Sequence, residues 1–232
     1  MDLTAKEIAR MIDLSCVRTN SSKDDIRELV RNARQSGFGQ VSVLQCFIPF
    51  TRELLGDNPE GVRVVGNVSF PSGSDSTSIK VMQAREMAAA GCDEIDMVIN
   101  VGRLISGEVA ETAGDVRAVV AAASPIPVKV IIEVPYLTPS QIETACGICI
   151  DAGAAFVKTG TGWADKGTTV EDIRLIKSIV GDRIKIKASG GIRNLQTLVE
   201  MYRQGARRFG VNLKSGLFIL GEALAQTAVA SD

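Results

Sequence analysis

Short apolar runs alternate with longer segments of helical periodicity along almost the whole chain. The runs are rich in Val and Ile, which is typical of buried strands. Between the runs, apolar residues recur at helical spacing, as they do at Ile26, Leu29 and Val30. The pattern predicts about eight strands, at residues 11–14, 41–44, 62–70, 94–99, 128–134, 156–159, 184–188 and 208–211.

The segments between the strands begin at residues that cap helices. A Ser or Thr followed three residues later by Glu or Gln forms a capping box, and Pro fits the first helical position. The predicted boxes are Thr4 with Glu7, Thr138 with Gln141, and Thr168 with Glu171. The predicted helices begin near residues 4, 22, 77, 108, 138, 168 and 195, and a last helix follows the final strand.

The regular alternation of strands and helices favours a parallel sheet. Eight such units in 232 residues fit a closed (β/α)8 barrel better than an open doubly wound sheet. No Gly-x-Gly-x-x-Gly motif follows the first strand, which weakens a Rossmann interpretation. No linker interrupts the pattern. We therefore predict an α/β fold, a TIM barrel in a single domain over residues 1–232, with a short N-terminal helix.

Composition narrows the class of function. The chain is 45% apolar and 23% charged with a net charge of −1, as in an ordinary globular protein. No basic stripe suggests a nucleic-acid partner, and no apolar run is long enough to span a membrane. The N-terminal residues do not resemble a signal peptide. We expect a cytoplasmic protein whose five cysteines stay reduced.

The chain contains no histidine. Serine and cysteine nucleophiles activated by histidine are thereby excluded, and proton transfer falls to Asp, Glu, Lys, Tyr, Cys or water. Cys146 and Cys149 have the spacing of a redox pair, but they lie about two turns into a predicted helix. Reactive thiols lie at helix N-termini, so neither a redox role nor a zinc site is favoured.

Two lysines stand out because each lies in an apolar strand and precedes a glycine-rich segment. A desolvated lysine near a second cation has a depressed pKa and can form a Schiff base, and Lys158 is the first candidate. Lys187, one βα unit later, is a candidate for the second cation, and Lys185 and Lys129 compete for that role. The alternative is structural: a lysine can reach solvent from a strand end or pair with an acid, as Lys129 would with Glu133.

Asp96 lies between Ile95 and Met97 and is the candidate for a buried carboxylate. Such a group can relay protons or pair with a lysine, although it can equally be an ion-pair member that only supports the barrel. The preceding Asp93 and Glu94 are expected to face solvent.

Glycine-rich turns follow the last two strands. Gly190 and Gly191 precede a helix, and Gly210 and Asn212 follow the final strand. Backbone N–H groups at such turns bind anions, and barrels often hold phosphate after strands seven and eight. The alternative is that these turns need glycine for backbone reasons alone.

Over nearly its whole length, the chain resembles the 2-deoxyribose-5-phosphate aldolase family, class I aldolases that use a Schiff base on a (β/α)8 barrel. The strings that carry the resemblance are Ile12-Asp13-Leu14, residues 93–102, Ser106-Gly107, residues 129–133, residues 153–159 and residues 185–193.

The resemblance implies a reversible aldol addition in deoxyribose phosphate catabolism. Acetaldehyde would form an enamine on Lys158 and attack glyceraldehyde 3-phosphate, without a metal or organic cofactor. Lys187 would lower the pKa of Lys158 and relay protons, and Asp96 would be the catalytic aspartate. The substrate-binding and phosphate-binding positions implied are Gly190, Gly191, Gly210, Asn212, Asp13 and Thr159. The class suggests a homodimer that acts on a small aldehyde or sugar phosphate.

The chain departs from the family pattern around the acceptor. The departures are Gly160, Trp163, Ser42-Val43-Leu44-Gln45, the loop Gly210 to Ser215, and the absence of a tyrosine at residues 228–232. A Schiff-base aldolase or lyase with a different, unphosphorylated substrate is therefore the alternative, and a non-catalytic binding barrel is a third interpretation.

Overall fold

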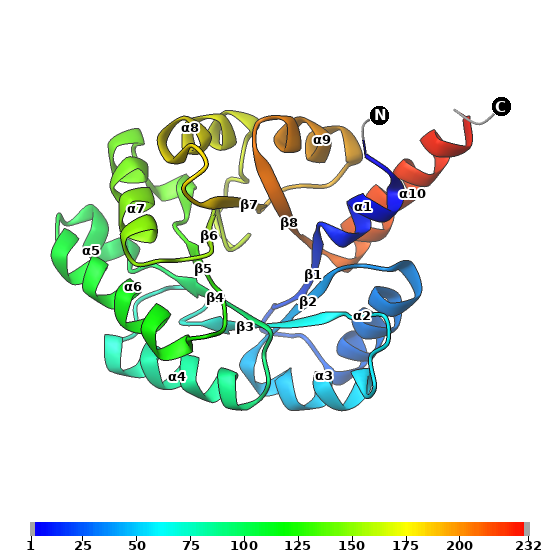
Figure 1. The fold of residues 1–232 in the computed structure, drawn as a ribbon, viewed down its shortest axis with the longest axis horizontal. Helices are drawn as coiled ribbons and strands as arrows, with labels where there is room; N and C mark the ends of the chain where they lie inside the picture. The colour runs from blue at the N-terminus through cyan, green and yellow to red at the C-terminus, as the bar shows by residue number, and fades with distance from the viewer. Residues whose placement is uncertain (1–2, 230–232) are drawn as a thin grey trace.

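A computed structural model describes the backbone of residues 3–229 and the side chains of residues 3–226. Eight parallel strands close into a barrel in chain order, and β1 pairs with both β2 and β8. Helices surround the ring of strands (Figure 1). The predicted TIM barrel is confirmed. Within the described residues, no helix is long and apolar enough to cross a membrane.

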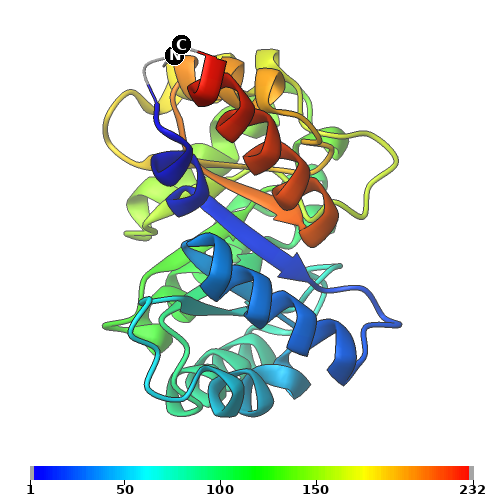
Figure 2. The same cartoon turned by 90° about the vertical axis from the view of Figure 1, so that its right-hand side faces the viewer.

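The strands lie close to their predicted positions. They are β1 Ile12–Cys16, β2 Gln40–Val43, β3 Arg63–Val68, β4 Glu94–Val98, β5 Val128–Ile131, β6 Phe156–Lys158, β7 Lys185–Ser189 and β8 Ala206–Asn212. The helices are α1 Ala5–Arg10, α2 Lys23–Ser36, α3 Ile48–Leu55, α4 Thr77–Ala89, α5 Val101–Ile105, α6 Val109–Ala123, α7 Pro139–Asp151, α8 Val170–Val180, α9 Leu195–Arg203 and α10 Leu213–Val229. Two short 3₁₀ helices, Gln45–Phe47 and Val134–Tyr136, follow β2 and β5. Figure 2 shows α1 beside the C-terminal helix α10.

Two of the three predicted capping boxes are confirmed, at Thr4 and Thr138. The third was placed one residue early, because α8 is capped by Thr169 with Asp172. The Thr168 hydroxyl instead lies within hydrogen-bond distance of the Thr159 hydroxyl and the Ser189 carbonyl. Helix α3 was not predicted, since no side chain caps its first turn.

Strand β5 ends earlier than predicted. Its regular pairing stops at Ile131, and Glu133 adopts a left-handed backbone conformation with φ 57°. Non-glycine residues seldom adopt this conformation. The turn brings the Glu133 carboxylate to the start of the loop after β6, where its Oε1 accepts a hydrogen bond from the Thr161 N–H at 3.0 Å.

Side chains alternate between two environments along each strand. Ile95, Val130 and Val157 are buried in the apolar layer between the barrel and its helices. Their neighbours in the chain, Asp96 and Lys129, point into the barrel and are equally buried. The outer layer is therefore a normal hydrophobic core, whereas the barrel interior holds charges.

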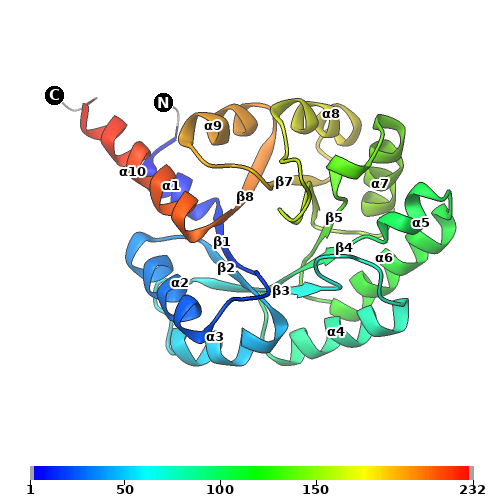
Figure 3. The same ribbon diagram turned by 180° about the vertical axis from the view of Figure 1, so that it is seen from behind.

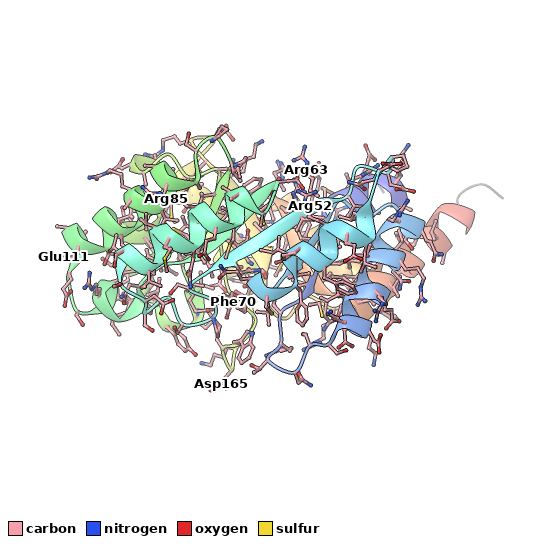
Figure 4. The ribbon with its side chains drawn as sticks, turned by 90° about the horizontal axis from the view of Figure 1, so that it is seen from below. Arg52, Arg63, Phe70, Arg85, Glu111 and Asp165 are labelled. Atoms are coloured by element: carbon pink, nitrogen blue, oxygen red, sulfur yellow. The ribbon has the colours of Figure 1, made fainter. Side chains whose placement is uncertain are left out.

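The C-terminal ends of the strands form one face of the molecule. Figure 4 shows Arg63 and Phe70, at the start and just beyond the end of β3, on opposite sides. Asp165, in the loop after β6, projects on the same side as Phe70. Figure 3 shows that loop lying across the centre of the ring.

One buried ion pair outside the barrel holds the strand that carries Asp96. Lys80 of α4 lies 2.5 Å from Asp115 of α6, and the two side chains are 0% and 3% exposed. The Lys80 ammonium also donates to the Val98 carbonyl at the end of β4. Removing one partner of such a pair leaves the other charge buried without compensation.

We expect Lys80→Met to lower the free energy of unfolding by about 3–5 kcal/mol, because the Asp115 carboxylate would be stranded. The double variant Lys80→Met with Asp115→Leu should lose much less. Urea unfolding measures both. Arg27→Met, which breaks the exposed pair with Asp24, is the control and should leave the midpoint near that of the parent. Equal losses in the single and double variants would contradict this account.

Candidate active site

The three predicted catalytic side chains meet inside the barrel around the carboxylate of Asp96. Oδ2 of Asp96 lies 2.6 Å from Nζ of Lys158 and 2.9 Å from Nζ of Lys187. A third ammonium, that of Lys129, lies 3.0 Å from Oδ1. Strand register produces the cluster, since Lys158 is paired with Lys187 and Asp96 with Lys129.

The electrostatics of this cluster keep Asp96 ionised. Burial would raise the pKa of the fully buried Asp96 carboxyl, but Lys129, Lys158 and Lys187 outweigh burial and hold its pKa well below the usual range. Asp96 is therefore a permanent acceptor that fixes the positions of three ammonium groups.

Lys158 has the environment of a nucleophilic amine. Its side chain is 6% exposed, and burial, opposed by Asp96 and assisted by Lys187, lowers the pKa of Lys158 to about 8. At pH 7 roughly a tenth of the molecules then carry the free amine, against about one in 2,500 for an ordinary lysine. Burial and a neighbouring cation are the two devices that activate lysine nucleophiles.

Lys187 has the opposite property. Burial lowers its pKa, but Asp13 at 2.5 Å and Asp96 at 2.9 Å outweigh burial and raise the pKa of Lys187. Lys187 therefore remains an ammonium beside Lys158. Neighbouring groups whose pKa values are pushed apart divide naturally into a nucleophile and a cationic acid.

The rivals for the second cation are placed elsewhere. Lys185 is exposed at the start of β7 and lies 5.7 Å from the centre of the Phe156 ring. Lys129 is fully buried one layer deeper than Lys158. It does not pair with Glu133, as the alternative supposed. Instead it lies between Asp96 and Glu94, forming a 2.5 Å ion pair with Glu94 that lacks hydrogen-bond alignment.

The prediction that Glu94 faces solvent is wrong. Its carboxylate is 4% exposed inside the barrel, where it also contacts Arg63 at 3.0 Å and Arg208 at 4.0 Å. Because side chains alternate along a strand, Glu94 must share the inner face with Asp96. Asp93 does lie at the surface, where it accepts a hydrogen bond from Arg52.

Two hollows that share wall residues lie beside this cluster, and together we call them the active-site cavity. Lys158, Lys187 and Asp13 line its narrow inner part, of about 20 Å³, together with Phe70 and Asn67. A wider part of about 620 Å³ shares several walls with the inner part. The shared walls are Ser15, Val17, Thr161, Ser189 and Gly210.

The glycine-rich turns lie at the wide end of the cavity. Gly190 and Gly191 have φ values of 100° and 82°, and a Cβ on Gly191 would lie 3.1 Å from the Gly167 Cα. Both positions therefore require glycine for backbone reasons, and both residues also line the cavity. Lys214, in the first turn of α10, lines it too, and an N-terminus of a helix this long favours an anion.

The close approach of β8 to the cluster depends on Gly210. A Cβ there would lie 2.7 Å from Ser189 Oγ and 3.4 Å from Cε of Lys187. Asn212 lines the cavity, and its side-chain oxygen accepts a hydrogen bond from the Ser215 N–H at 2.8 Å. Asn212 thereby caps the first turn of α10.

Two predicted substrate contacts have other partners. Asp13 is fully buried under Lys187 and also contacts Arg208 at 3.4 Å, so it acts as a counter-ion. The Thr159 hydroxyl is buried behind the cavity lining, where it donates to the Ser189 carbonyl and accepts from Thr168. A substrate contact by Thr159 would require that hydroxyl to leave these partners.

Residues at the rim were not predicted as a group. The Arg18 guanidinium lies 4.8 Å over the Trp163 ring and donates to the Gly162 carbonyl. Phe70 packs edge-on against Trp163, with 6.4 Å between ring centres. Three loops, after β1, β3 and β6, thus meet at the mouth, and only the identity of Trp163 had signalled a feature there.

Carboxylate and cysteine side chains bear on two other kinds of site, a metal site and a redox thiol pair. Within the described residues, no group of three or more Cys, Asp or Glu side chains is arranged to hold a metal ion. Cys146 and Cys149 are fully buried in α7, and burial raises the pKa of Cys146 to about 12. Burial raises the pKa of Cys149 as well, so both thiols stay protonated.

Over almost its whole length the chain resembles known aldolases. A family model described as "DeoC/LacD family aldolase" matches residues 8–221. The deoxyribose-phosphate aldolase of Sinorhizobium medicae is 42% identical over 224 residues, which cover 96% of this chain and 90% of that protein. Among solved structures, the aldolase QR15 superposes with a TM-score of 0.89 at 35% identity, covering 96% of this chain and 98% of QR15. A tetrameric deoxyribose phosphate aldolase from Aeropyrum pernix gives 0.87 at 26% identity, covering 96% and 93% of the two chains.

The roles of the two lysines predict a change in pH dependence. Acetylation of Lys158 by a small anhydride, followed by mass spectrometry, should reach half its maximal rate near pH 8 in the parent. Lys187→Met should raise that midpoint by about one pH unit, because the repulsion that disfavours the Lys158 ammonium is lost. Lys185→Met, on the same strand but outside the cluster, is the control. A shift of equal size in both variants would contradict the assignment.

Proposed function

The chain belongs to the DeoC/LacD family of aldolases, and on this premise we propose that it is a class I aldolase with deoxyribose-phosphate aldolase activity. Lys158 forms the Schiff base, acetaldehyde is the donor and glyceraldehyde 3-phosphate is the acceptor. The observation that carries the proposal is the pairing of Lys158, whose pKa is lowered to about 8, with a permanently charged Lys187 across one shared carboxylate.

The chemistry follows from these two protonation states. The free amine of Lys158 attacks the carbonyl carbon of acetaldehyde, and the resulting carbinolamine loses water to give an iminium ion. Loss of a proton from the methyl carbon gives the enamine, whose terminal carbon forms the new bond to the acceptor carbonyl carbon. The acceptor oxygen takes up a proton, and hydrolysis of the product iminium restores the amine.

Lys187 and Asp96 support the proton steps. The Lys187 ammonium lies within reach of the Asp96 oxygen that also holds Lys158, so a proton can be given to the carbinolamine hydroxyl and returned. Asp96 keeps the two nitrogens at fixed positions, which reduces the reorganisation needed at each step.

The wide part of the cavity suits a phosphorylated acceptor. Gly190, Gly191 and Gly210 expose backbone there, the α10 N-terminus borders it, and Lys214 adds a positive charge. The aromatic pair Phe70 and Trp163 at the rim favours the second candidate, an aldolase for a less polar, unphosphorylated aldehyde.

Assembly and location remain predictions. The relative from Aeropyrum pernix is tetrameric, whereas the sequence predicts a homodimer. A cytoplasmic location and the single domain likewise stay predictions. The missing tyrosine concerns residues 228–232, which lie outside the residues whose side chains are described.

Borohydride trapping tests the Schiff base. Incubation with acetaldehyde and borohydride should add a reduced two-carbon group to Lys158, located by mass spectrometry of peptides. Lys158→Leu should abolish the adduct and lower retro-aldol activity by at least about 10³-fold, because no other amine there has the same environment. Lys185→Met is the matched control and should be labelled like the parent. Labelling of Lys187 or Lys129 in place of Lys158 would contradict the proposal.

Retro-aldol kinetics test the acceptor. Deoxyribose 5-phosphate should be cleaved with a kcat/KM at least about 100-fold above that of deoxyribose. Deoxyribose has no phosphate, so it would leave the polar groups of the anion site without a partner. Gly191→Ala should reduce this advantage, since the backbone there has φ 82° and little space. Gly181→Ala, at φ 56° with no neighbour within 4 Å, is the control for backbone strain alone. Equal rates on the two sugars would favour the unphosphorylated acceptor.

A further inference from the structure

Arg208 of β8 enters the barrel from the end opposite the active-site cavity. Its side chain is 18% exposed and reaches Asp13 Oδ1 at 3.4 Å and Glu94 Oε1 at 4.0 Å. It also lies 6.0 Å over the Phe156 ring, in the wall of a second cavity of about 470 Å³. Arg63, which marks that end of the barrel in Figure 4, contacts Glu94 as well. The proposed reaction gives Arg208 no role.

The contacts of Arg208 close a ring of alternating charges. Each neighbouring pair in the ring is an ion pair of 4.0 Å or less. In order, the ring is Arg208, Asp13, Lys187, Asp96, Lys129, Glu94 and back to Arg208. Three cations and three anions alternate, so the ring is neutral by itself. All six side chains are buried to at least four-fifths.

Lys158 stands outside this ring as a surplus cation. Among the described residues it forms an ion pair with one carboxylate only, that of Asp96, which already has two partners in the ring. A protonated Lys158 adds one positive charge to this neutral ring, whereas the free amine adds none. Uncompensated buried charge is costly, so the cluster lowers the pKa of Lys158 and raises the fraction of free amine.

We propose that Arg208 is a positioning residue that completes the ring and thereby makes Lys158 the one lysine of the cluster without a counter-ion of its own. This inference rests on the proposed function for its catalytic meaning. Without Arg208 the remaining ring has two cations and three anions, and a protonated Lys158 would supply the missing charge. The free amine, which forms the Schiff base, would then be disfavoured.

Two other charged groups, Glu133 and Arg63, face the cluster. Neither affects the comparison between the parent and the variants of the ring. Glu133 lies near Lys158 at the cavity end, where burial raises the pKa of its carboxyl. Arg63 contacts Glu94 at the opposite end with 58% of its side chain exposed, so water screens its charge. The two have opposite charges, and both are retained in each variant below.

The charge count predicts an ordered series of variants. Removing Arg208 leaves the ring at −1, removing the charge of Glu94 leaves it at +1, and removing both restores neutrality. Each change of one unit in the charge of the ring should move the acetylation midpoint of Lys158 by about one pH unit. We therefore expect the midpoint to rise in Arg208→Met, to fall in Glu94→Gln, and to return near the parent value in the double variant.

The controls separate charge from packing. Arg207→Met removes the adjacent arginine, which donates to the backbone carbonyls of Tyr202 and Ala206 and makes no ion pair with the ring in the described residues. It should leave the midpoint unchanged. Arg208→Lys keeps the charge and should stay within a few tenths of a pH unit of the parent. Circular dichroism establishes that each variant is folded.

A folded Arg208→Met protein with the parent midpoint would overturn the inference, as would a double variant shifted as far as Arg208→Met. If Arg208→Met does not fold, Glu94→Gln decides, because an unchanged midpoint in that variant would equally overturn the ring account. The acetylation readout needs no aldol substrate. An ordered series together with failed acetaldehyde trapping would therefore refute the proposed function while the inference about Arg208 stands.

Discussion

The carboxylate of Asp96 holds three ammonium groups within 3.0 Å in the middle of the barrel, and the arrangement of the site depends on it. Burying so many charges is costly unless each is paired, so the strands must place the partners in register around one point. Closure of the barrel brings these partners together. Asp96 and the three lysines come from β4, β5, β6 and β7, while Asp13 comes from β1 and Arg208 from β8. The outer apolar layer stabilises the barrel, while the inner layer defines what it can do.

The three lysines differ in chemistry because they differ in counter-ions. Lys129 and Lys187 each lie between two carboxylates, whereas Lys158 shares one that is already occupied. The same side chain therefore serves as a fixed cation at two positions and as a nucleophile at the third. The cavity adds the remaining distinction, since it reaches Lys158 and Lys187 but not Lys129. Substrate access thus excludes Lys129, and charge balance distinguishes Lys158 from Lys187.

Much of this could be predicted from the sequence, because apolar flanks around Lys158, Lys187 and Asp96 mark buried charges in strands. The partners could not, since pairing across strands depends on register and on which face of each strand points inward. Glu94 was placed in solvent for this reason, and Lys129 was paired with Glu133, whose left-handed backbone turns it toward Thr161 instead. Arg208, beside a second arginine in the chain, carried no signal that it closes a buried ring. The sequence does not distinguish Thr168 from Thr169 as the cap of α8, because a shift of one residue gives an equally good capping pattern.

The most direct test that Lys158 forms the Schiff base is a crystal structure of the protein soaked with deoxyribose 5-phosphate and reduced with borohydride. The account predicts continuous density from Nζ of Lys158 to the first carbon of the sugar. It also predicts Lys187 beside that carbon and the phosphate between the glycine turns and the start of α10. A covalent bond at Lys187 or Lys129, or an intact sugar bound away from Lys158, would contradict the account.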